Sequence, residues 1–328
     1  MSRIQYIHTY EHIISHENIL LAWKEFLKGK KQRKDVLDFE QNLMANIIDL
    51  HHGLVTKTYT HSEYEAFNIS DPKPRSIHKA RVCDRLLHHT LHRELHPFFD
   101  KTFIADSYSC RKGKGTHKAI EQFRAFSNKV SKNNTKTVWV LKGDIRKFFA
   151  SIDQKILIEI LMQYIPDKNT ISLLSEIIGS FNSTKKGVGL PLGNLTSQLF
   201  VNVYMNEFDQ FVKHKLKTKY YIRYADDFVV LSHDKKWLES TLLQMAVFLH
   251  EHLRLSLHPN KVSIETLASG VDFLGWIHFP HHRQLRTTTK RRMLKNLKGC
   301  PTPETINSYL GLLGHGNTHK LQKRVGLC

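Results

Sequence analysis

The sequence predicts an α+β fold in which an antiparallel sheet is packed among many helices. Short apolar stretches rich in β-branched residues stand at 137–143, 218–234 and 271–279, and longer segments with helical spacing of apolar residues lie between them. The strands do not alternate regularly with helices, as a parallel βαβ sheet requires, and no internal repeat recurs at a fixed period. The 328 residues leave room for two or three sub-domains and a sizeable core.

Helices are predicted where apolar residues recur on one face. Ser15 is a plausible cap for the first of them, because its hydroxyl can accept a hydrogen bond from a free N–H in the first turn. The helix predicted over 84–98 is expected to end at Pro97, since proline has no N–H and its ring obstructs the preceding turn. The predicted helices are 15–29, 35–54, 84–98, one that begins near Thr116, and a mostly helical, basic tail from Thr287.

Strands are predicted at four places. Residues 71–82 are rich in proline and cations, which favours a strand and loop over a helix. Residues 137–143 are apolar and β-branched, which indicates a buried strand, and it ends at Asp144. Residues 218–234 hold two short strands joined at Ala225-Asp226-Asp227, which predicts a hairpin with carboxylates at its tip. Residues 271–279 are predicted as one further strand, and the His281-His282 pair as a loop.

The charge of the chain points to a polyanionic partner. Lys and Arg number 49 against 30 Asp and Glu, so the net charge is +19, which favours nucleic acid first and an acidic membrane surface second. No run of eighteen apolar residues and no apolar signal core occur, so we expect a soluble, cytoplasmic chain without a membrane partner. The cysteines form no CxxC pair and suggest neither a disulfide frame nor a cysteine zinc site: Cys83, Cys110, Cys300 and Cys328.

Three carboxylates carry the strongest chemical signal. Asp226 and Asp227 are adjacent on the predicted hairpin, and they alone fit a solvated turn equally well, because Asp is common in turns. Asp144 at the end of the buried strand changes this interpretation, since carboxylates from neighbouring strands can share two Mg²⁺ ions. Such a pair of ions would activate a primer 3′-hydroxyl and neutralise a leaving pyrophosphate.

Four stretches in order resemble motifs A, B, C and E of reverse transcriptases. They are LKGDIRKFFASID at 141–153, GLPLGNLTSQ at 189–198, YIRYADDFVVLS at 221–232 and VDFLGW at 271–276. The resemblance extends from about residue 18 to 325 and implies a right-hand polymerase fold. It implies an N-terminal extension and fingers over 1–135, a palm over 136–280 with a helical fingers insertion near 155–190, and a short helical thumb over 281–328.

The same resemblance implies roles for individual residues. Asp144, Asp226 and Asp227 would hold two Mg²⁺ ions, or Mn²⁺, with help from the Ile145 carbonyl. Lys261 matches the motif D lysine, which would protonate the departing pyrophosphate or simply contact a phosphate. The primer grip, which holds the 3′ end of the primer, would be Phe273, Leu274, Gly275 and Trp276.

The resemblance also implies nucleotide contacts. Phe149 matches an aromatic steric gate that excludes a 2′-hydroxyl and so selects dNTPs, although the residue alone would fit a core phenylalanine. Lys73 and Arg75 would grip the incoming triphosphate, and Arg111 would meet template or nucleotide. A solvated cationic face is the alternative for all three cations. The basic tail from Arg286 would let the thumb grip duplex phosphates.

Motif B narrows the resemblance further. Most relatives have Gln-Gly-x-x-x-Ser-Pro there, whereas this chain has Leu192, Gly193 and, at the last position, Gln198. This pattern is similar to reverse transcriptases of diversity-generating retroelements, group II intron-like bacterial or phage enzymes. Those enzymes copy a template-repeat RNA into adenine-mutagenised cDNA that rewrites a variable gene region (mutagenic retrohoming). The resemblance implies dNTPs, template RNA, the cDNA/RNA duplex and a small basic oligomeric accessory protein as partners.

Three alternatives stay open on the sequence. The chain could be another bacterial reverse transcriptase of a defence-associated, retron-like or intron type. It could instead be a catalytically silent RNA-binding scaffold, although a scaffold has no need of all three acids. Zinc is the third: His88, His92 and His96 share a helical face beside His89, but the outer two lie about 12 Å apart along the axis, too far for one ion.

Overall fold

The structure is a computed structural model that describes residues 3–70, 74–298 and 301–326. Lys73, Cys300 and Cys328 lie outside the described residues. The chain divides into two compact units, each formed by segments that are distant in sequence. Unit 1 consists of Met1–Ala105, Ile145–Phe211 and Val247–Ser256, and unit 2 of Asp106–Asp144, Val212–Ala246 and Leu257–Cys328.

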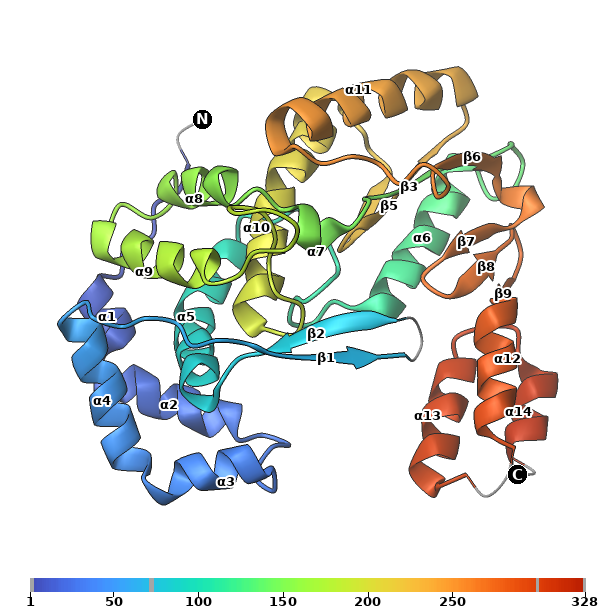
Figure 1. Cartoon of the computed structure of the whole chain (residues 1–328). Helices are drawn as coiled ribbons and strands as arrows, with labels where there is room; N and C mark the ends of the chain where they lie inside the picture. The colour runs from blue at the N-terminus through green and yellow to red at the C-terminus, as the bar shows by residue number, and fades with distance from the viewer. Residues whose placement is uncertain (1–2, 71–73, 299–300, 327–328) are drawn as a thin grey trace. The chain divides into compact units, whose positions relative to one another are not determined.

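Unit 1 is mainly helical (Figure 1). Its core is built around α5 and α10, which pack against each other, while α2 covers α5 and α8 packs on both α9 and α10. Its helices are α1 (Tyr10–Ile14), α2 (His16–Phe26), α3 (Lys34–Gln41), α4 (Leu43–Val55), α5 (Val82–Asp100), α7 (Phe148–Ser151), α8 (Gln154–Met162), α9 (Lys168–Gly179) and α10 (Leu195–Gln210). Its strands β1 (Glu65–Ile69) and β2 (Arg75–Lys79) form an antiparallel pair.

The first predicted helix is confirmed, and two of the later predictions need correction. The Ser15 hydroxyl accepts a hydrogen bond from the Asn18 N–H at 3.2 Å and caps α2. The predicted helix 35–54 is two helices, because the chain leaves helical geometry at Asn42, where φ is −120° and ψ is 36°.

The prediction that the third helix ends at Pro97 is wrong. Pro97 lies inside α5, which continues to Asp100. The missing N–H removes one bond of the last turn, and aromatic packing of the residues that follow holds the turn in place. Phe98 packs edge-on against Tyr6 at 5.3 Å between ring centroids, and Phe99 against Tyr164 at 5.4 Å.

Unit 2 contains two antiparallel sheets (Figure 1). The larger has the strand order β4-β5-β3-β6, and the smaller has the order β7-β8-β9. Its strands are β3 (Trp139–Asp144), β4 (Tyr221–Tyr224), β5 (Asp227–Ser232), β6 (Ser263–Thr266), β7 (Val271–Phe273), β8 (Trp276–His278) and β9 (Arg283–Leu285). Its helices are α6 (Thr116–Val130), α12 (Thr287–Asn296), α13 (Pro303–Leu313) and α14 (His319–Gly326), and the 3-10 turn η2 (Leu267–Ser269) follows β6.

Two further helical segments contribute residues to both units. They are the π-helical turn η1 (Phe211–Lys215) and α11 (Lys235–Leu253). The predicted α+β class with an antiparallel sheet is confirmed, since every strand pair recorded in a sheet is antiparallel.

The core of the larger sheet explains why its strands are apolar. Helix α6 packs on β4 and β5, and alternate residues of the strands face it. Phe123 and Phe126 of α6 share this core with Val140 of β3 and with Val229 and Leu231 of β5. Phe228 and Val230 are equally buried, so both faces of the strand are covered and the run is apolar without interruption.

The prediction of one strand over 271–279 is wrong. The segment is a tight hairpin in which Phe273 pairs with Trp276. Leu274 and Gly275 form its two-residue loop with φ values of 50° and 88°, as a type I′ turn requires, and glycine adopts such angles without a steric penalty. The predicted helical tail is confirmed by α12, α13 and α14, which enclose a core of Met293, Leu297 and Leu313.

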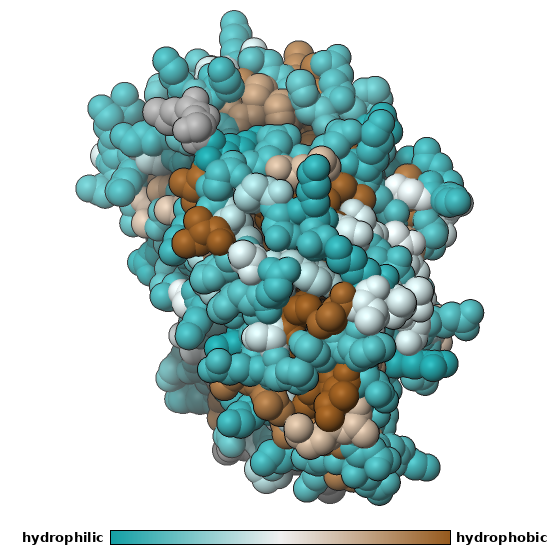
Figure 2. Space-filling model, turned by 90° about the vertical axis from the view of Figure 1, so that its left-hand side faces the viewer, coloured by the Kyte–Doolittle hydropathy of each residue, from teal (hydrophilic) through white to brown (hydrophobic). Residues whose placement is uncertain are grey.

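One face of the molecule is largely polar. Figure 2 shows a face on which hydrophilic residues predominate and hydrophobic residues form small separate patches. Among the described residues, no helix combines the length and the apolar composition that a membrane crossing needs.

Candidate active site

The end of the larger sheet in unit 2 brings acidic side chains together. Asp144 is the last residue of β3 and pairs directly with Asp227, the first residue of β5. Directly opposed residues of antiparallel strands have Cα atoms about 4.5–5.5 Å apart. Asp226 precedes Asp227 in the loop between β4 and β5. Two segments more than eighty residues apart in sequence therefore place three carboxylates at one end of the two inner strands of this sheet.

A buried arginine supports the hairpin tip. Because Tyr224 pairs with Asp227, the loop consists of Ala225 and Asp226 alone, and Ala225 has a φ of 55°. Arg223 is wholly buried, and its Nη1 donates to the Ala225 carbonyl at 3.1 Å. Its Nη2 donates to the Ser107 hydroxyl at 3.2 Å. The sequence analysis missed Arg223; the available signal was a cation in the apolar strand YIRY.

Close packing also fixes the position of Asp144. A Cβ on Gly143 would lie 2.2 Å from the Phe228 ring, so only glycine fits beside this phenylalanine. The Asp144 carbonyl accepts a hydrogen bond from the His258 N–H at 2.7 Å. The backbone that carries Asp144 is thus held on both sides.

The carboxylates at this site repel one another and are stabilised by nearby positive charge. The Lys261 ammonium donates to both carboxylate oxygens of Asp144, at 2.9 and 2.8 Å. Burial and the negative charges of Asp226 and Asp144 together raise the pKa of Asp227 to about 6, against the opposing effect of Lys142 and Lys261. Carboxylate oxygens are ligands that Mg²⁺ prefers, and a divalent cation would relieve this repulsion, so the residues fit the predicted metal site.

Lys261 does not have the free ammonium that the motif D role requires. In this structure both of its measured contacts are to Asp144. To reach a pyrophosphate the side chain has to leave that carboxylate. Its exposure of 41% is compatible with such a movement, and the role stays a prediction.

A basic loop lies beside the hairpin within unit 2. Ser107 forms a parallel bridge with Arg223, and the Tyr108 N–H donates to the Arg223 carbonyl at 3.0 Å. Arg111 Nη1 donates to the Ser107 carbonyl at 3.0 Å. The loop that carries Arg111 is thereby attached to β4, whereas its predicted contact with template or nucleotide is untested.

Two of the predicted nucleotide contacts in unit 1, Leu192 and Gly193, lie beside β2. The His78 N–H donates to the Leu192 carbonyl at 3.0 Å, and the Asn194 amide donates to the His78 carbonyl at 3.0 Å. Gly193 therefore lies beside the strand that begins at exposed Arg75. Gln198 is half-buried in the first turn of α10.

The backbone of Phe149 contacts the segment that leads to Leu192. Its carbonyl accepts a hydrogen bond from the Leu190 N–H at 2.8 Å, two residues before Leu192. The Phe149 ring is half-buried and packs edge-on against Phe148 at 5.6 Å. Ile145, the neighbour of Asp144, is buried at the start of a segment of unit 1. The roles predicted for both stay predictions.

The predicted primer grip is the β7–β8 hairpin. Phe273 and Trp276 are each 1% exposed and belong to the two cores of unit 2. Their rings cannot reach a primer, so only the turn at Leu274 and Gly275 is available for contact. The Gly275 carbonyl accepts from the Arg286 N–H at 3.0 Å, which fixes this turn to the start of α12.

The histidines of α5 have structural roles. His88 is buried and its Nε2 lies 3.2 Å from Nε2 of His61, and burial lowers the pKa of His88 to about 3. His92 packs on His96 instead. Among the described residues, the three ligating side chains with metal-like spacing are His8, His12 and Glu94 of unit 1, which do not include the predicted zinc set.

Comparison with known proteins identifies the family. A profile described as reverse transcriptase (RNA-dependent DNA polymerase) matches residues 70–278. Protein YkfC of Escherichia coli is 24% identical over 277 residues, which cover 73% of this chain and 70% of that protein. The group II intron-encoded protein LtrA of Lactococcus lactis is 22% identical over 275 residues, which cover 62% of this chain and 44% of LtrA.

The fold agrees with this assignment. The telomerase of Candida tropicalis, truncated from its C-terminal domain, superimposes with a TM-score of 0.50 at 12% identity, covering 73% of this chain and 59% of that one. A likeness at that identity speaks for the fold alone. The matched profile covers more than half of the chain and includes both strands that carry the acids, Asp144 and Asp227. The chain therefore belongs to the reverse transcriptase family of RNA-dependent DNA polymerases, distantly related to the group II intron proteins.

Proposed function

We propose that this protein is the reverse transcriptase of a diversity-generating retroelement, acting in the cytoplasm of a bacterial or phage-infected cell. It copies a template-repeat RNA into cDNA with errors at adenines. The pairing of Asp144 with Asp227 supports the polymerase chemistry, because it joins two acids from distant segments. The Leu192-Gly193 start and Gln198 end of motif B support the retroelement class.

The reaction is phosphoryl transfer to a primer 3′-hydroxyl. Two Mg²⁺ ions held by Asp144, Asp226 and Asp227, with Mn²⁺ as a substitute, would supply the positive charge that activates the hydroxyl and neutralises the leaving pyrophosphate. The protein's own part is to hold these acids close to one another. Arg223 and Gly143 keep the two strand ends in position for this task.

Further residues are assigned to substrate selection. Arg75 and Lys73 contact the triphosphate of a dNTP, Arg111 contacts template or nucleotide, and the Ile145 carbonyl assists the metal site. Lys261 donates a proton to pyrophosphate after it leaves Asp144. Template RNA and the cDNA/RNA duplex bind to this chain, whose net charge of +19 suits a polyanion. A small basic oligomeric accessory protein completes the active assembly.

Primer extension followed by cDNA sequencing tests this proposal. The purified protein is supplied with an RNA template, a primer, dNTPs and Mg²⁺, with and without the RNA and accessory gene that flank its own gene. Extension with errors concentrated at template adenines is the expected result. Accurate cDNA would identify another class of bacterial reverse transcriptase. If no primer is extended under any of these conditions, the remaining interpretation is a catalytically silent RNA-binding scaffold.

Phe149→Ala is expected to raise ribonucleotide incorporation by about tenfold or more, because removing the ring opens space for a 2′-hydroxyl. The measurement is the ratio of kcat/KM for dNTP and rNTP in single-nucleotide extension. Phe148→Ala is the control for loss of an aromatic ring, since Phe148 is buried beside it. An unchanged ratio in Phe149→Ala would remove the gate assignment.

Leu192→Gln is expected to lower misincorporation opposite template adenine several-fold. An amide can form hydrogen bonds near the nascent base pair, whereas leucine cannot, so the variant adds a polar check on geometry. The readout is the error spectrum of sequenced cDNA. Leu195→Gln, three residues further along the same segment, controls for the change in polarity. A spectrum equal to that of the unmodified protein would contradict this role.

A further inference from the structure

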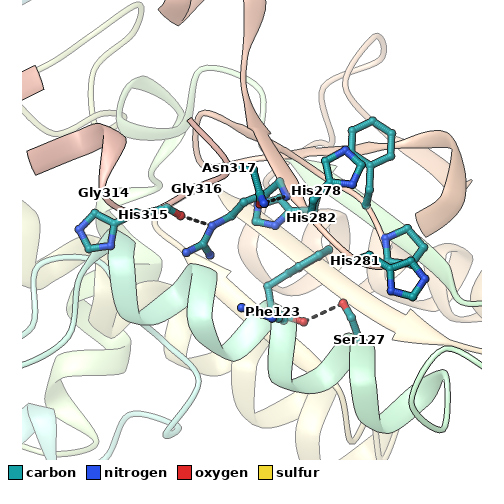
Figure 3. A pocket seen from close by; sticks show the side chains of 13 residues that line it. Phe123, Ser127, His278, His281, His282, Gly314, His315, Gly316 and Asn317 are labelled. Atoms are coloured by element: carbon teal, nitrogen blue, oxygen red, sulfur yellow. Dashed lines mark hydrogen bonds between the residues drawn. The ribbon is translucent and has the colours of Figure 1, made fainter. Parts of the chain in front are cut away.

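A cavity in unit 2 has a lining that includes none of the site residues assigned above. It has a volume of about 280 Å³ and is enclosed by three stretches of chain: α6, the β8–β9 loop, and the turn between α13 and α14. Figure 3 shows Phe123 and Ser127 of α6 on one side, the loop histidines His281 and His282 on another, and Asn317 above them. A volume at the lower end of the range for ligand pockets suits a small group better than a whole base and sugar.

The lining of the cavity is cationic. Arg124 and Arg283 both border it, together with imidazoles from the β8–β9 loop and from His315. No carboxylate belongs to the lining among the described residues. Burial lowers the pKa of Arg283, the charge of Arg124 lowers it further, and Glu121, one turn earlier on α6, opposes both effects. Like charges brought together in a cavity favour the binding of an anion between them.

Arg283 has an unsatisfied donor at this place. Its Nε donates to the His315 carbonyl, and its guanidinium lies 5.7 Å above the Trp276 ring. Its Nη1 is inaccessible to water and has no hydrogen-bond acceptor among the described residues. Buried donors are nearly always paired in folded proteins, so Arg283 is held at an energetic cost beside the cavity that it lines.

The remaining walls are held firmly. The Asn317 side-chain oxygen accepts from the Arg283 N–H at 3.3 Å, which ties the α13–α14 turn to the start of β9. His315 stacks on His117 of α6 at 3.5 Å between ring centroids, and His282 stacks on Phe279 at 4.7 Å. His278 stands 4.5 Å from the Phe123 ring at the base of the cavity. The cavity is therefore formed before any ligand arrives.

We propose that this cavity is a phosphate-binding site in which Arg124 and Arg283 grip a phosphate group. A guanidinium presents two parallel N–H donors that match phosphate oxygens, and both arginines border the cavity. Among the described residues of this cavity, no group of ligating side chains has metal-like spacing. The phosphate can belong to a free small ion or to the end of a nucleic acid strand, and the two sources share this recognition.

Binding is measured by isothermal titration in EDTA with about 0.15 M salt, so that neither metal nor polymerisation contributes. The probes are inorganic phosphate, pyrophosphate, and a short RNA oligonucleotide with a 5′-phosphate or a 5′-hydroxyl. We expect saturable binding of pyrophosphate or a clear preference for the phosphorylated oligonucleotide. The first result identifies a free ion as the source, and the second identifies a strand end.

Arg124→Gln is expected to weaken this binding by about tenfold or more, because it removes a charge-assisted hydrogen bond. Lys129→Gln is the matched control, since Lys129 is exposed on the same helix, carries the same charge and does not line the cavity. Arg283→Lys keeps the charge but loses the fork, and it should also weaken binding while the protein stays folded. Absence of binding by every probe, or an equal loss in Arg124→Gln and Lys129→Gln, would overturn the site and would leave the polymerase proposal intact.

Discussion

Asp226→Asn and Asp227→Asn are each expected to reduce primer extension by about a thousandfold or more, which corresponds to about 4 kcal/mol of transition-state stabilisation. Each substitution removes one negative charge from the acids at the end of the β3–β5 pair while keeping the size of the side chain. Asp144→Asn should have the same effect, and it also removes the ion pair with Lys261.

The thermal stability of these variants separates chemistry from folding. Because Asp227 is repelled by its acidic neighbours, its neutral replacement should not lower Tm in the absence of metal. Glu265→Gln provides the control, since Glu265 is exposed on β6 of the same sheet and loses the same charge. Full synthesis by any single variant of the acid cluster would refute the proposed chemistry.

Arg223→Met is expected to lower the free energy of unfolding by about 3 kcal/mol and Tm by about 5 °C or more. Methionine fills much of the same volume but leaves the Ala225 carbonyl and the Ser107 hydroxyl without their donor in a buried place. The rate of primer extension should fall by more than the loss of folded protein explains, because the loop that carries Asp226 loses the hydrogen bond from Arg223 to Ala225.

Unfolding in urea and single-turnover extension below the Tm measure the two effects separately. Lys219→Met is the surface control, because Lys219 is exposed near the start of the same strand. This substitution removes the same charge as Arg223→Met. Wild-type stability in Arg223→Met would show that the guanidinium is not required for the hairpin. Wild-type activity in a destabilised variant would show that it does not position the acids.

Local sequence patterns predicted the elements that carry the acids. The run 137–143 is apolar because β3 lies in the middle of its sheet, with β5 on one side and β6 on the other. Two apolar runs around a short polar loop predict a hairpin over 218–234, and β4 and β5 form it. Both signals are local, since the burial of a strand and the chemistry of a turn depend on a few neighbouring residues.

Two predictions failed because packing between distant residues decided the outcome. Proline is expected to end a helix, but α5 continues past Pro97 because Phe98 and Phe99 pack against other aromatic rings. Residues 271–279 appear as one apolar run, yet Phe273 and Trp276 fill two different cores, so the chain reverses between them. Nothing in either local pattern contains this information.

The chain's own sequence determined the family, the charge and the identity of the acids, because motif order and residue type are properties of the sequence. Tertiary structure decided the register that sets Asp144 opposite Asp227, the burial of Arg223 beneath Ala225 and the cationic cavity around Arg283. The strand register and the cavity bring together residues that are tens of positions apart in sequence. The burial of Arg223 depends on how closely its own backbone approaches the segment that carries Ser107. Such contacts form only when the apolar faces of α6 and of the strands pack together and fix the distances between segments.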